Sequence, residues 1–138
     1  MNYTTLFFCL TLLVSHKADA QKATFYSTNY KQECWWNADT KKYDKCTGGS
    51  ESSLFKLNGE QTMFHHTTEK ISSDYYVTKR EYDKENDVTT YDVKSDVGNT
   101  YFFIVDTKDN QLRILGNNKT SENKTYMHIF TIKQSWTE

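Results

Sequence analysis

The chain has 138 residues, with 17 Lys and Arg against 18 Asp and Glu, and a formal net charge of −1. Such a balance provides no basic excess for nucleic-acid binding. Ten Tyr, eight Phe and three Trp with no Pro are typical of a β-rich protein. The aromatic content also argues against disorder. We therefore expect one folded domain without a nucleic-acid partner.

The chain opens with an apolar run at residues 5–14. This run is shorter than the roughly 20 residues of a membrane-spanning helix, but it suits the apolar segment of a secretory signal peptide. Ala18-Asp19-Ala20 then follows as a small-x-small cleavage pattern. We expect residues 1–20 to be a removed signal peptide and residues 21–138 a single all-β domain. The protein would be secreted, or periplasmic in a bacterium, without a membrane span. The alternative is a short core strand in a cytosolic protein, since residues 1–5 carry no Lys or Arg.

Two cysteines remain after this cleavage, Cys34 and Cys46. In an exported protein an even pair usually forms a disulfide, which we expect here. The alternative, a metal-binding or nucleophilic pair, is disfavoured because the sequence has no Cys-x-x-Cys motif.

The rest of the chain alternates short apolar-polar runs with turn signals. Asn58-Gly59 is a strong tight-turn dipeptide, whereas residues 47–53 have the composition of a Gly/Ser linker. In chain order, the predicted strands cover residues 23–30, 32–38, 43–46, 54–58, 61–67, 74–83, 88–95, 100–106, 111–115 and 125–134. Residues 32–38 and 43–46 are expected to form a hairpin under the disulfide.

Most of these connections are short, so strands that are neighbours in sequence should pair antiparallel. We predict an all-β fold, an antiparallel meander of about 8–10 short strands that forms a barrel or a sandwich. In outline such a meander resembles a lipocalin barrel. The lipocalin Gly-x-Trp signature is missing, because Glu33-Cys34 precedes Trp35. The resemblance is architectural and implies no function.

Adjacent histidines, His65 and His66, would point to opposite faces of a strand and cannot bind one metal together. His66 would share its face with Phe64. One hypothesis joins a single histidine with His128, from the last strand, as a metal site or an acid/base pair. We favour one core-edge histidine beside one exposed histidine, because no third ligand stands at a motif spacing.

An acidic turn at Asp83, Glu85 and Asp87 begins like a calcium-binding loop. Val88 and Lys94 then stand where such a loop requires Gly and Glu, so we expect a hydrated turn. We predict no metal and no cofactor, since the sequence also lacks a P-loop, a dinucleotide fingerprint and a Gly-x-Ser-x-Gly motif.

Two glycosylation sequons begin at Asn118 and Asn123 in a polar loop, residues 116–124. They are potential acceptors only in a eukaryotic secretory pathway.

The densest aromatic group is Trp35, Trp36 and Tyr43, which we take as a tentative ligand-binding site. We expect a monomeric, secreted, non-enzymatic binding domain for a small apolar molecule or a protein surface. One alternative is an inhibitor or immunity-type protein that blocks a partner protein through residues 116–124. A less favoured alternative is an extracellular hydrolase that uses His66 or His128 with a turn aspartate.

Overall fold

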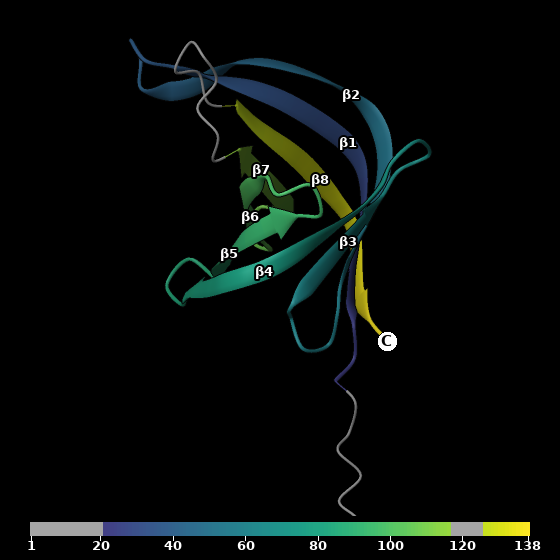
Figure 1. The fold of residues 1–138 in the computed structure, drawn as a ribbon. Coiled ribbons are helices and arrows are strands. Elements are labelled where there is room, and N and C mark those ends of the chain that lie inside the picture. The colour runs from purple at the N-terminus through teal and green to yellow at the C-terminus, as the bar shows by residue number, and fades with distance from the viewer. Residues whose placement is uncertain (1–20, 117–125) are drawn as a thin grey trace, which may run out of the picture.

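The protein is a closed barrel of eight antiparallel strands, which follow one another around the barrel in chain order (Figure 1). This computed structural model describes residues 21–116 and 126–138. The strands are β1 (Thr24–Asn37), β2 (Lys42–Leu57), β3 (Met63–Thr67), β4 (Ser72–Asp83), β5 (Val88–Ser95), β6 (Thr100–Asp106), β7 (Gln111–Gly116) and β8 (Tyr126–Thr137). The predicted all-β meander is confirmed, and it closes as a barrel because β8 pairs with β1.

Two predicted features lie outside the described residues, namely the signal peptide at residues 1–20 and the sequons at Asn118 and Asn123. In the part of the chain that the structure describes, no helix is long and apolar enough to cross a membrane.

The first two strands are longer than predicted. The two strands predicted at residues 23–30 and 32–38 are one strand, β1, which covers residues 24–37, and the supposed linker at residues 47–53 is part of β2. The linker prediction was therefore wrong. The physical reason is that β1 and β2 pair from Thr24–Leu57 to Asn37–Lys42, so ladder hydrogen bonds hold residues whose composition favours a loop.

The predicted disulfide is present and joins Cys34 to Cys46, with an S–S distance of 2.06 Å. These two residues are directly paired across the β1–β2 ladder. The bond therefore fastens the outer part of the long hairpin that arches over one end of the barrel (Figure 1). A structural disulfide is consistent with an oxidising compartment.

The centre of the barrel is filled by large side chains that point inward. Their aromatic rings pack mostly edge to face or tilted; for example, the centroids of Phe55 and Phe130 lie 4.9 Å apart, and those of Phe64 and Phe103 lie 5.1 Å apart. All four rings are fully buried. Burial of such a side chain stabilises the fold by roughly 1.5–3 kcal/mol. The middle of the barrel is thus a packed core, and space for a ligand lies toward its ends.

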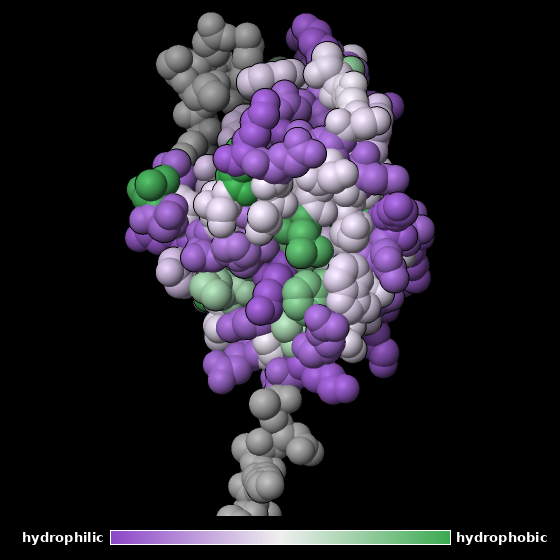
Figure 2. Space-filling view, turned by 90° about the vertical axis from the view of Figure 1, so that its right-hand side faces the viewer, coloured by the Kyte–Doolittle hydropathy of each residue, from purple (hydrophilic) through white to green (hydrophobic). Residues whose placement is uncertain are grey.

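The outer surface is mostly hydrophilic. Viewed from the right-hand side of Figure 1, it shows a short central stripe of hydrophobic residues among polar and charged ones (Figure 2). The barrel wall is incomplete beside β2, because β2 pairs with β3 only from Leu54 to Leu57. Residues 42–53 of β2 therefore form an edge, with no neighbour on that side among the described strands.

Candidate functional site

On the inner face of the β1–β2 hairpin, charged side chains take the place that the Phe rings occupy in the core. Along β2, Phe55 is a core residue, and the strand period of two places Ser53 and Glu51 on the same inner face. Along β1 the bulge between Thr28 and Tyr30 shifts the inward positions by one residue.

After this bulge, Lys31 and Glu33 face inward. Both have inward neighbours on β8, since Lys31 pairs with Phe130 and Glu33 pairs with His128. The Lys31 Nζ atom lies 5.8 Å from the centre of the Phe130 ring. The bulge thus turns two charged side chains toward the interior, immediately beyond the packed core.

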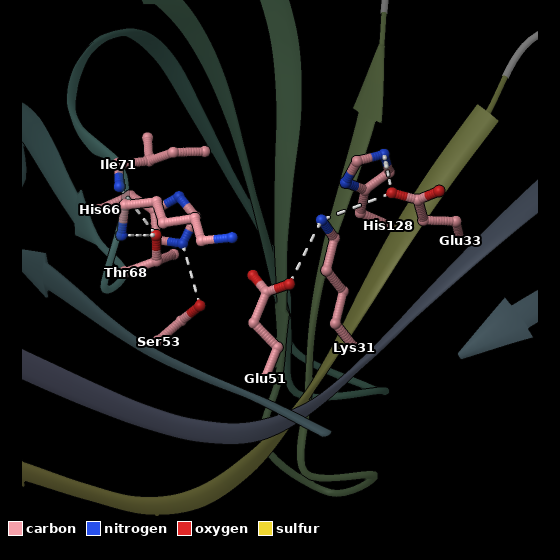
Figure 3. Close-up of polar contacts among 9 residues, drawn as sticks. Lys31, Glu33, Glu51, Ser53, His66, Thr68, Ile71 and His128 are labelled. Carbon is pink, nitrogen blue, oxygen red and sulfur yellow. Dashed lines mark hydrogen bonds and ion pairs between the residues drawn. The ribbon is translucent and has the colours of Figure 1, made fainter. Parts of the chain in front are cut away.

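Lys31 stands between two carboxylates. Its Nζ lies 3.4 Å from Glu33 Oε1 and 3.8 Å from Glu51 Oε2 (Figure 3). The side chain of Lys31 is 22% exposed, against 48% for Glu33 and 39% for Glu51. Such partly exposed pairs contribute at most about 1 kcal/mol each to stability. The carboxylates consequently keep free acceptor capacity toward solvent.

His66 and His128 lie on either side of this charged group (Figure 3). His66 is buried, and its Nε2 lies 3.2 Å from Ser53 Oγ. Burial, followed by the positive charge of Lys31, lowers the pKa of His66 to about 4. Burial and Lys31 also lower the pKa of His128, although Glu33 and Glu51 act in the opposite direction. Both imidazoles are therefore neutral near pH 7, and the 3.8 Å approach of His128 to Glu33 is not an ion pair there.

Two adjoining hollows open at these residues. One, of about 400 Å³, lies between β2 and the β3–β4 turn, and the other, of about 220 Å³, lies over the inner face of the hairpin. They share Lys31, Ser50 and Glu51. We call them together the polar chamber, which is lined by Lys31, Glu33, Thr47, Gly48, Gly49, Ser50, Glu51, Ser52, Thr68, Glu69, Lys70 and Ile71. The incomplete wall beside β2 leaves this chamber open to solvent.

Of the three aromatic residues singled out from the sequence, only Trp36 and Tyr43 are brought together. Trp35 packs against Tyr126 of β8, with ring centroids 5.7 Å apart. Trp36 packs edge to face on Tyr43 at 5.1 Å. Because Trp35 and Trp36 are adjacent in β1, they point to opposite sides of the barrel wall. Only Trp35 lies on the same face as Lys31 and Glu33.

The histidine pair is divided as expected from its strand. His66 faces the core with Phe64, and His65 is on the outer face, where it contacts Asp74 and Ser72. Among the residues that the structure describes, no group of three or more His, Cys, Asp or Glu side chains is placed to hold a metal ion.

Sequence reasoning missed Lys31, Glu33 and Glu51. A lone Lys or Glu in a Tyr- and Thr-rich strand is ordinarily solvent-facing, and the bulge that turns two of them inward has no sequence signature. Comparison with protein-family models, curated proteins and solved structures found no match to this chain.

Proposed function

We propose that the protein is a secreted binding protein that holds a small, hydrophilic, positively charged molecule in the polar chamber. The observation that supports this most strongly is the position of Lys31 between Glu33 and Glu51. Two half-exposed carboxylates share one ammonium group, which leaves an excess negative charge in the chamber. At the rim, Glu69 and Lys70 balance each other.

The size of the chamber also favours a small ligand. The larger of its two hollows, about 400 Å³, lies in the lower part of the range for small-molecule sites, about 300–1,000 Å³. The packed rings of Phe55 and Phe130 lie beneath the charged group, so a long apolar chain would not reach into the barrel. This argues against the small apolar ligand that the composition suggested.

Because the histidines beside the chamber are neutral near pH 7, they are compatible with a positively charged ligand. Near pH 7 the His128 imidazole adds no positive charge that would repel a cation, and it offers one donor and one acceptor. Trp35 and Tyr126 lie farther along the same inner face, where an aromatic ring can contact a cationic group. The Cys34–Cys46 bond would keep the hairpin that carries these side chains rigid outside the cell.

Calorimetric titration of the mature protein with a size-matched panel tests this proposal. The panel would contain small organic cations, their neutral isosteres and anions of similar shape. We expect binding of cations only, weakened about tenfold or more in the Glu33→Gln/Glu51→Gln double variant. Glu81→Gln is the matched control, since Glu81 is an exposed carboxylate on β4 that pairs with Lys79. Equal binding of anions or neutral isosteres, or equal weakening in the control, would overturn the proposal.

A further inference from the structure

A second polar cluster lies on the outer face of β3 and β4, and none of its three members lines the polar chamber. Ser72 Oγ is 3.2 Å from His65 Nε2, and His65 Nδ1 is 2.5 Å from Asp74 Oδ1. An ionised carboxylate only accepts hydrogen bonds, so in neutral His65 the proton is on Nδ1 and is donated to Asp74. Nε2 is then free to accept the Ser72 hydroxyl. This is the bonding order of a Ser-His-Asp catalytic triad.

The β3–β4 register explains why these side chains meet. His65 is directly opposite Asp74, and Thr67 is directly opposite Ser72. The Thr68 N–H donates to the Ile71 carbonyl at 2.8 Å, which fixes the alternation of the ladder. By that alternation His65 and Asp74 form a non-hydrogen-bonded pair, in which side chains approach most closely. Ser72 precedes Asp74 by two residues and so lies on the same face.

The same alternation leaves a backbone donor beside the hydroxyl. It turns the Ser72 N–H away from β3, toward the side on which β5 lies. Pairing between β4 and β5 begins only at Tyr75, so Ser72 is beyond the end of that ladder. Its N–H is therefore available to stabilise negative charge that develops on a carbonyl oxygen attacked by Ser72 Oγ.

The surroundings offer apolar surface for a small substrate. A hollow of about 370 Å³ lies one strand away from Ser72: its lining includes Thr67, the cross-strand neighbour of Ser72, but none of the three triad residues. Leu54, Ile71 and Tyr76 are among the large apolar side chains that remain exposed on the barrel. Leu54 is in the same cross-strand row as Ser72, and Tyr76 follows Asp74 by two residues.

From this geometry we propose that Ser72 is an acyl-accepting nucleophile for small, unhindered carboxylic esters, with His65 as its base and Asp74 as the residue that orients His65.

Ser72 Oγ attacks the ester carbonyl carbon and its proton passes to His65 Nε2. The ester C–O bond breaks, and the leaving alcohol takes that proton. Water then attacks the acylated Ser72 and gives its proton to His65. The carboxylic acid leaves as Ser72 recovers its hydroxyl proton. This activity is separate from ligand binding in the polar chamber and uses different residues.

The chain contains its own control for this chemistry. His66 Nε2 and Ser53 Oγ are also 3.2 Å apart, but both residues are buried, and no carboxylate among the described residues is hydrogen-bonded to His66. If a Ser–His contact alone sufficed, Ser53 would react as well. We expect Ser72 to be acylated and Ser53 to remain unmodified.

The experiment is incubation of the mature protein with p-nitrophenyl acetate, followed by peptide mass spectrometry and measurement of p-nitrophenol release. We expect an acetyl group on Ser72 and release above the rate of an unfolded sample. Ser72→Ala should abolish the excess release, Asp74→Asn should reduce it at least tenfold, and Ser53→Ala should leave it unchanged. Ser72 is exposed and the Asp74 side chain is 41% exposed, so the barrel should fold in both triad variants, whereas Ser53→Ala removes a single hydroxyl from a buried position. Absence of acetyl-Ser72, or an unchanged rate in Ser72→Ala or Asp74→Asn, would overturn the proposal.

Discussion

His66 stacks on Phe55, with ring centroids 4.1 Å apart and planes within 4° of each other. A histidine in this position behaves as a core aromatic residue as long as it is neutral. Protonation would leave a positive charge among phenyl rings and near Lys31, which is why the pKa of His66 falls to about 4.

This contact predicts acid sensitivity of the fold. The unfolded chain takes up the His66 proton near pH 6.5, and the folded barrel takes it up only near pH 4. Between these values the unfolded state binds more protons, so the stability contributed by neutral His66 is complete above about pH 6.5 and is lost as the pH falls toward 4. We expect the loss to reach about 2–3 kcal/mol. Urea unfolding at pH 7 and pH 4.5 measures it.

In the same measurement, His66→Phe should keep the stacking on Phe55 and lose this part of the pH dependence. Acidic groups elsewhere titrate alike in both proteins, so the difference between them isolates His66. His65→Gln is the control, because His65 is on the outer face. A His66→Phe variant as acid-sensitive as the wild type would contradict the prediction.

The disulfide predicts a second stability effect. Replacement of Cys34 and Cys46 by Ala removes a bond that closes a short loop, for which we expect a cost of about 3 kcal/mol. The β1–β2 ladder and the core should still form, since the packed rings lie at the other end of the strands. Thermal unfolding of the double variant, compared with the oxidised and the reduced wild type, gives the value. Reduced wild type and double variant should unfold together.

Patterns in the sequence predicted most of the fold. The hairpin at Asn58-Gly59 and the strands from β4 to β7 follow from alternation and turn residues. The prediction failed at residues 47–53, where pairing with β1 overrides a loop-like composition. Strand alternation also separated His65 from His66.

The sites were harder to predict than the strands. The polar chamber depends on a bulge that turns Lys31 inward, and the outer triad depends on which residue of β4 lies opposite His65. Both are properties of register rather than of local sequence. A sequence gives the period of a strand, whereas the partner of each residue is set by packing and turn geometry over the whole barrel.

Substitution of a buried ring in the core should also lower the free energy of unfolding. Phe103 is fully buried and contacts Phe55, Phe64 and Tyr75 through edge-to-face or tilted ring contacts. Phe103→Leu should lower the free energy of unfolding by about 1–2 kcal/mol, because it removes ring contacts and leaves a small cavity. Val97→Ala, at a position that is 78% exposed, should change it by less than about 0.5 kcal/mol. Chemical denaturation of both variants tests the difference.

Gly48 and Gly49 lie in the segment that was predicted to be a linker, and their replacement by Ala should have different effects on stability. A Cβ atom at Gly48 would lie 2.5 Å from the Tyr30 hydroxyl oxygen and 2.9 Å from the adjoining ring carbon, whereas one at Gly49 would meet no atom within 4 Å. Gly48→Ala should therefore displace the Tyr30 ring and destabilise the barrel by about 1 kcal/mol. Gly49→Ala should be neutral or stabilising by up to about 1 kcal/mol, because Ala restricts the unfolded chain. The cost of Gly48→Ala should largely disappear in a Tyr30→Ala background, where the ring is gone. Urea unfolding of the four variants completes the cycle, and equal effects at the two glycines would show that residues 47–53 behave as a loop.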